Sequence, residues 1–167
     1  MRLLFAGPTC VGKTRFLKLL ESEQNIVGPF PTTKGVYSQN HGEDLELLDS
    51  GGRACDLKHI KRDACVLVHD CDRNDPTMLR SSYHSLRPEA ILQVSNFPLP
   101  DDRTEAFCNL SRLPLVRFCW TDPTRVGETL YKIVAAVALT KRRYQTQSPK
   151  KTRCLSLDMK HEVIYRH

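Results

Sequence analysis

The stretch Gly7-Pro8-Thr9-Cys10-Val11-Gly12-Lys13-Thr14 lies near the N-terminus and matches the pattern G-x-x-x-x-G-K-[ST]. The apolar run at residues 2–6 precedes it and predicts a buried strand, while residues 15–20 follow it and predict a helix. A strand that leads through a glycine loop into a helix N-terminus is the context in which this pattern binds phosphate. The sequence therefore predicts a phosphate-binding loop at residues 7–14.

The expected chemistry of this loop is local. Backbone N–H groups would surround the phosphates, Lys13 would reach the β- and γ-phosphates, and the Thr14 hydroxyl would coordinate Mg²⁺. Asp49 follows an apolar run and would complete the metal site from the end of a neighbouring strand. A strand-end turn aspartate is the alternative, but the phosphate loop and its spacing from Asp49 favour the metal role. The residues predicted to bind phosphate are Gly7, Thr9, Cys10, Val11, Gly12, Lys13, Thr14 and Gly52.

The order of apolar runs predicts an α/β fold. Strands are expected at residues 2–6, 36–39, 45–48, 64–69, 90–94 and 115–120, with the second and third forming a hairpin. Helices are expected at 76–86 and 125–143, the latter capped by Thr124. This alternation indicates a mostly parallel six-stranded sheet with helices on both faces, whose ligands bind at the carboxyl ends of the strands.

The 167 residues are expected to form one domain over residues 1–143, a linker at 145–149 and a basic tail within 144–167. Residues 141–167 hold eight Lys and Arg against two acidic residues and account for the whole net charge of +6. Such a tail can bind an acidic partner, an anionic membrane or RNA, but it is more often a solvated end, and no nucleic-acid partner is predicted.

Other features of the composition point to an intracellular protein. No apolar run approaches the ~20 residues that span a bilayer, and no signal peptide or lipid-attachment motif is recognised. The seven cysteines form no C-x-x-C pair, so we expect them to be reduced rather than disulfide-bonded or metal-bound. We therefore expect a cytoplasmic location and no lipid anchor.

The chain resembles the Ras-like small GTPases at the phosphate loop, at residues 31–35 (P-T-T-K-G) and at residues 47–52 (L-L-D-S-G-G). The resemblance implies a Ras-like P-loop NTPase fold with GTP or GDP and Mg²⁺ as its ligands. It implies that Thr33 is the switch I threonine that closes on Mg²⁺, beside Thr14 and Asp49. It also makes Gly52 part of a switch II of the Arf type, which has two adjacent glycines.

Two motifs of that family are altered. Arg53 stands where the family has the glutamine that orients the attacking water, so hydrolysis should be slow without a partner, and no catalytic residue is assigned. Residues 95–99 (S-N-F-P-L) replace the guanine-reading motif N-K-x-D. Asn96 and Phe97 are the candidate base-binding residues, and the paired aspartates at 101–102 could substitute only if the loop bends. Selectivity for guanine therefore stays open.

A narrower resemblance is to the Rab-like small GTPase subunit of intraflagellar transport complex B. It is carried by the G-P-x-x-x-G-K-T loop, by T-T-K-G-V at residues 32–36 and by the proline and paired aspartates at 98–102, although the family's usual tryptophan before Asp49 is Leu48 here. It implies nucleotide binding, little intrinsic hydrolysis and no lipid anchor. It further implies docking onto coiled-coil transport subunits through the switch regions, in the cilium or flagellum.

Three other functions stay open at this point. One is an Arf- or Rab-like trafficking GTPase that turns over with a partner. Another is a P-loop small-molecule kinase, for which residues 100–113 are short as an acceptor site or lid. The last is a pseudo-GTPase that binds no nucleotide, against which the intact Lys13, Thr14 and Asp49 argue.

Overall fold

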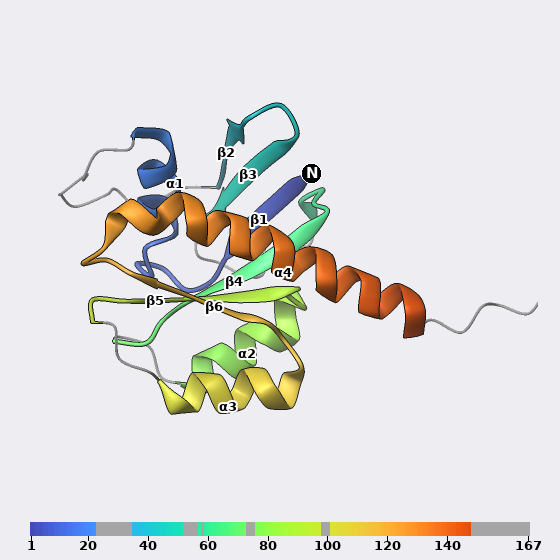
Figure 1. Ribbon diagram of the computed structural model, residues 1–167. Coiled ribbons are helices and arrows are strands. Elements are labelled where there is room, and N and C mark those ends of the chain that lie inside the picture. The colour runs from blue at the N-terminus through green and yellow to red at the C-terminus, as the bar shows by residue number, and fades with distance from the viewer. Residues whose placement is uncertain (23–34, 52–56, 58, 73–75, 98–100, 148–167) are drawn as a thin grey trace, which may run out of the picture.

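The chain folds into one sheet flanked by helices (Figure 1). The computed structural model describes residues 1–22, 35–51, 57, 59–72, 76–97 and 101–147. Its elements, in chain order, are β1 (Arg2–Ala6), α1 (Lys13–Ser22), β2 (Val36–His41), β3 (Leu45–Ser50), β4 (Ala64–Asp70), α2 (Pro76–Leu86), β5 (Ala90–Ser95), α3 (Asp102–Ser111), β6 (Leu115–Cys119), the short 3₁₀ helix η2 (Pro123–Arg125) and α4 (Val126–Gln147).

The sheet confirms the predicted α/β architecture. Its six strands lie in the order β2-β3-β1-β4-β5-β6. Only β2 is antiparallel to its neighbour, because the hairpin at residues 42–44 joins it directly to β3. The other neighbours pair in parallel, and parallel strands need a crossover connection, which here is usually a helix. The carboxyl ends of these parallel strands therefore share one edge of the sheet, where the loop at 7–14 begins.

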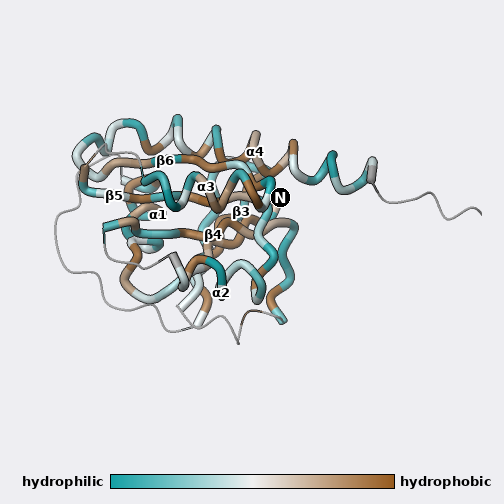
Figure 2. The backbone as a smooth tube through the Cα atoms, turned by 90° about the horizontal axis from the view of Figure 1, so that it is seen from below, coloured by the Kyte–Doolittle hydropathy of each residue, from teal (hydrophilic) through white to brown (hydrophobic). Residues whose placement is uncertain are grey.

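Helices cover both faces of the sheet and create two cores. Leu3 and Phe5 of β1 pack on the face covered by α1 and α4, whereas Leu4 and Ala6 pack on the face covered by α2 and α3. Strands β4 and β5 are buried along their whole length, which explains their nearly continuous apolar sequence. Figure 2 shows apolar residues along these inner strands. No helix among the described residues is both long and apolar enough to cross a bilayer.

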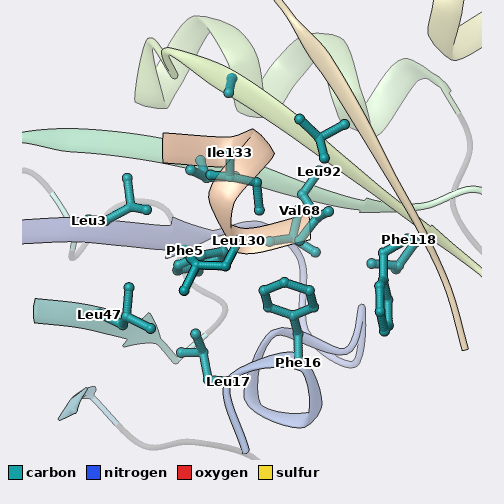
Figure 3. Close-up of a cluster of buried hydrophobic side chains, with 14 of the residues drawn as sticks. Leu3, Phe5, Phe16, Leu17, Leu47, Val68, Leu92, Phe118, Leu130 and Ile133 are labelled. Atoms are coloured by element: carbon teal, nitrogen blue, oxygen red, sulfur yellow. The ribbon is translucent and has the colours of Figure 1, made fainter. Parts of the chain in front are cut away.

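An aromatic cluster links β1, α1 and β6 in the first core (Figure 3). The Phe16 ring lies 5.8 Å from that of Phe5 and 5.2 Å, edge to face, from that of Phe118. Phe118 in turn contacts Trp120 edge to face at 5.0 Å. Aromatic pairs at such distances stabilise a core by about 0.5–1.5 kcal/mol beyond their burial. The cluster thus connects the helix that follows the phosphate loop to the end of β6.

Three local predictions differ from the structure. Helix α3 was not expected, yet Asp101 caps it by accepting hydrogen bonds from the N–H of Arg103 and the hydroxyl of Thr104. Thr124 does not cap α4, because it lies within η2 and its hydroxyl donates to Asp122. Helix α4 continues to Gln147 and includes residues assigned to a linker. Residues 148–167 of the tail lie outside the described part of the chain.

Candidate functional site

The loop at residues 7–14 joins the end of β1 to the start of α1 in a backbone conformation that suits glycine. Gly7 has φ +148° and Gly12 has φ +90°. A Cβ at Gly7 would lie 2.4 Å from the carbonyl oxygen of Val68, because the loop passes directly over β4. Cys10 also has a positive φ, of 64°, and is exposed. This conformation brings the loop back over the sheet edge so that α1 begins there, at Lys13.

Lys13 is held inside the loop. Its side chain is only 5 % exposed, and its Nζ donates to the carbonyl oxygens of Gly7 (3.1 Å) and Pro8 (2.7 Å). Burial lowers the pKa of Lys13 below its usual range, while the nearby Asp49 and Cys10 oppose that shift. A buried ammonium group at the N-terminus of a helix adds its charge to the positive end of the helix dipole. The loop therefore presents positive potential to an anion.

Thr14 and Asp49 meet beside this loop. Asp49 is fully buried near the end of β3, and β3 pairs with β1 in the register Phe5 to Asp49. The Thr14 hydroxyl donates a hydrogen bond to Oδ2 of Asp49, although the two residues are 35 positions apart. A hydroxyl and a carboxylate are hard oxygen ligands of the kind that Mg²⁺ uses with substrate phosphates. The pair of residues predicted to hold Mg²⁺ therefore fits that ion by its chemistry.

Three residues predicted for the switches lie outside the described residues: Thr33, Gly52 and Arg53. Gly35, the last residue of the predicted first switch, accepts a backbone hydrogen bond of 2.8 Å from the N–H of Gly51. The remaining residues predicted to bind phosphate all lie on the one loop, with Val11 buried beneath it and Thr9 exposed. Among the described residues, the structure thus brings Thr14 and Asp49 together beside the loop, while the roles of Thr33 and Gly52 stay predictions.

The candidate base-binding residues follow β5 at the same edge of the sheet, but they take part in local contacts. The backbone N–H and the Nδ2 of Asn96 both donate to Oδ2 of Asp72, at 2.6 and 2.9 Å. The carbonyl oxygen of Phe97 accepts a hydrogen bond of 2.7 Å from the Ser95 hydroxyl, and the Phe97 side chain is 62 % exposed. Asp101 is used as the cap of α3. The Asn96 amide nitrogen and the Phe97 carbonyl oxygen therefore have local partners, and base binding by these two residues stays a prediction.

Sequence reasoning did not assign a role to Trp120 and Arg15, which lie against the phosphate loop. A Cβ at Gly12 would lie 2.4 Å from Cζ2 of Trp120, so the indole directly adjoins the glycine. The Arg15 guanidinium lies over the same indole, 4.4 Å from the ring centroid. The sequence predicted Trp120 as the last residue of a strand at 115–120, whereas β6 ends at Cys119, and the reach of Trp120 to α1 depends on tertiary packing.

The cysteines form no metal centre in the part of the chain that the structure describes. Five are free thiols there: Cys10, Cys65, Cys71, Cys108 and Cys119. Burial raises the pKa of Cys65 and of Cys108 to about 12, so both stay protonated and behave as apolar core residues. Within the same described residues, no group of three or more His, Cys, Asp or Glu side chains could hold a metal ion.

The geometry is therefore that of a glycine loop around a buried lysine, with a Thr–Asp pair and an indole beside it, and it is compatible with the predicted phosphate loop. None of these features alone names a family. No protein-family model matches this sequence, and no curated protein matches it as a relative.

Proposed function

We propose that the chain is a P-loop nucleotide-binding protein of the Ras-like kind, which holds a nucleoside triphosphate with Mg²⁺ and uses it to stabilise a docking surface. The observation that supports this most directly is the buried Lys13, whose amino group is positioned by two carbonyl groups of the loop itself. Burying an ammonium group is costly unless it is paired. An anion in the loop would add its negative charge to that of Asp49, the nearby carboxylate that already favours the charged form of Lys13.

Coupling to a partner is supported by strand β2, which is an edge strand of the sheet. Tyr37 pairs with Asp49 across the β2–β3 ladder, and Val36 pairs with Ser50. The side chains of Val36 and Tyr37 are 43 % and 47 % exposed. A ligand that binds Asp49 on β3 would therefore stabilise the neighbouring strand β2 and its exposed apolar side chains. Nucleotides order partner-binding surfaces in this way in other proteins.

The identity of the partner rests on the resemblance of the loop and of residues 31–36 to the intraflagellar transport subunit. On that basis we propose coiled-coil transport subunits as the partners. Slow hydrolysis rests on Arg53 in place of glutamine, because arginine cannot accept a proton from the attacking water. The kinase alternative gains no support from residues 102–111, which form α3 and pack on the sheet through the buried Cys108.

The test is binding of GTP with Mg²⁺ to the full chain by equilibrium dialysis. Lys13→Ala should weaken binding by at least tenfold, since a charge-assisted contact contributes about 1.5–3 kcal/mol. Lys132→Ala is the matched control, because it removes the same charge from an exposed ion pair with Glu128 on α4. Equal affinity of wild type and Lys13→Ala would contradict nucleotide binding at the loop.

Hydrolysis is measured separately. We expect the isolated chain to release little phosphate over many hours in a multiple-turnover assay. Sustained release that Lys13→Ala abolishes would replace the docking function with that of a trafficking GTPase that turns over on its own. Partner binding is then tested by capturing coiled-coil transport subunits with the GTP-loaded and the nucleotide-free chain.

A further inference from the structure

The indole of Trp120 adjoins the phosphate loop at Gly12, and it follows β6, whereas Asp49 lies on β3. At the carboxyl edge of the sheet, β3 with Asp49 lies on one side of β1, and β4, β5 and β6 lie on the other. Asp49 marks the end of the loop where Mg²⁺ and the terminal phosphates of a triphosphate would lie. The opposite end of the ligand, which carries the nucleoside, must therefore point towards β4–β6, and Trp120 follows β6.

Trp120 is held firmly in that place. Its ring edge adjoins Gly12, and the Arg15 guanidinium in the first turn of α1 lies 4.4 Å from its centroid. Its contact with Phe118 at 5.0 Å joins it to the aromatic cluster that includes Phe16. A cation over an indole adds about 0.5–2 kcal/mol to such packing. These contacts fix the ring against the loop rather than leaving it as a mobile surface group.

The groups that could read a base have other partners. The Asn96 amide is bonded to Asp72, and the Asp101 carboxylate caps α3. A site that discriminates between bases needs buried polar groups that are left unpaired by the wrong base. At the carboxyl end of β5, the Ser95 hydroxyl is also bonded, to the carbonyl oxygen of Phe97. Farther back on β5, Oε1 of Gln93 is buried without a hydrogen-bond partner.

We propose that Trp120 fills the space towards which the nucleoside points, so that the site recognises the polyphosphate chain with its metal ion and does not read the base. This inference rests on the proposed function, because it concerns the same loop. The ligand class is a magnesium-bound triphosphate, and the base contributes little to the affinity. Lys13 and the loop N–H groups supply the recognition, while the Arg15 guanidinium stays over the indole.

The test compares GTP, ATP and inorganic tripolyphosphate, each with Mg²⁺, by calorimetry on the full chain. In the wild type the three affinities should agree within about fivefold, a window that allows for the extra charge of tripolyphosphate. A purine triphosphate that binds at least about tenfold more tightly than tripolyphosphate would overturn the inference while leaving the proposed function intact. Failure of all three ligands to bind would instead refute the proposed function.

Variants at Trp120 test whether the indole is the reason that the base contributes little to the affinity. Trp120→Ala should open the space beside Gly12 and raise the affinity for both purine triphosphates at least about tenfold relative to tripolyphosphate. Trp120→Leu keeps apolar contact with Phe118 and replaces the alanine variant if that variant folds poorly. It too should bind both purine triphosphates more tightly relative to tripolyphosphate than the wild type does. Tyr131→Ala removes an aromatic ring that is 76 % exposed on α4 and should leave the ratios unchanged. Unchanged ratios in both folded Trp120 variants would refute the role of the indole.

Intrinsic fluorescence gives an independent readout, because Trp120 is the only tryptophan in the sequence. Tripolyphosphate and GTP should change the emission to the same extent, since neither places a base on the ring. Quenching that occurs with GTP and ATP but not with tripolyphosphate would show that the base stacks on the indole, and it would overturn the inference.

Discussion

Replacement of Gly12 by alanine tests the contact on which the arrangement of the loop depends. The new Cβ would lie 2.4 Å from Cζ2 of Trp120, and the residue has φ +90°. The backbone conformation alone costs an alanine about 1 kcal/mol. Forcing the indole aside adds an overpacking cost of about 1–3 kcal/mol, because the ring is held by Phe118. We expect Gly12→Ala to lower the free energy of unfolding by about 2–4 kcal/mol.

A double-mutant cycle separates the two costs. Gly42→Ala is the matched control, because Gly42 also has a positive φ, +66°, but its Cβ would meet no atom within 4 Å. It should cost only about 1 kcal/mol. In a Trp120→Ala background, Gly12→Ala should become as mild as this control, with a coupling energy of about 1–3 kcal/mol.

The assay is urea unfolding of each variant followed by far-UV circular dichroism, since the fluorescent tryptophan is lost in two of them. Equal destabilisation by Gly12→Ala in the presence and absence of the indole would refute the packing of Trp120 on the loop. A cost at Gly12 no larger than that at Gly42 would refute it as well. Either outcome also removes the basis for the inference about base recognition.

Three further predictions concern ionisable and capping residues. Burial lowers the pKa of Lys13, and a bound anion raises it again. The affinity for tripolyphosphate, measured by calorimetry, should therefore fall as pH rises through that lowered pKa, by up to about tenfold per pH unit. An affinity that does not change at alkaline pH would contradict this. Burial also lowers the pKa of His69, against the opposing charge of Asp101, so the unfolded state takes up a proton that the folded state does not. The free energy of unfolding should then fall as pH drops below about 6.5, the pKa of histidine in the unfolded state. His69→Gln should make this fall shallower by up to about 1.4 kcal/mol per pH unit, as measured by urea unfolding at a series of pH values. An unchanged dependence on pH would count against a neutral, buried His69. Asp101→Ala should lower the free energy of unfolding by about 1–2 kcal/mol, because α3 loses its cap. Asp102→Ala, in the exposed first turn, is the control and should lower it by only about 0.3–0.5 kcal/mol. Equal losses in the two variants would show that Asp101 is not the cap.

Local patterns sufficed for much of the fold. Residues 2–6, 64–69 and 90–94 are short apolar runs, and each is a strand that is covered on both faces. The predicted hairpin of β2 and β3 is confirmed. It could be predicted because its turn and its two strands are adjacent in the chain. Helix α3 was missed since its signal lies in the capping interactions of Asp101 rather than in an apolar stripe. The cap predicted at Thr124 was wrong because Thr124 lies within η2 and its hydroxyl bonds Asp122. Helix α4 also continues to Gln147, past the end predicted for it.

The sequence by itself determined the prediction of a phosphate loop, because the glycines, Lys13 and Thr14 of that motif lie within eight consecutive residues. It also suggested Asp49, whose position at a strand end could be inferred from chain order. Only the tertiary structure decided what lies beside the loop. Trp120 is more than 100 residues from Gly12 in sequence, and the two meet because parallel strands place their carboxyl ends at one edge of the sheet. No local pattern encodes a contact that depends on the order of strands in a sheet.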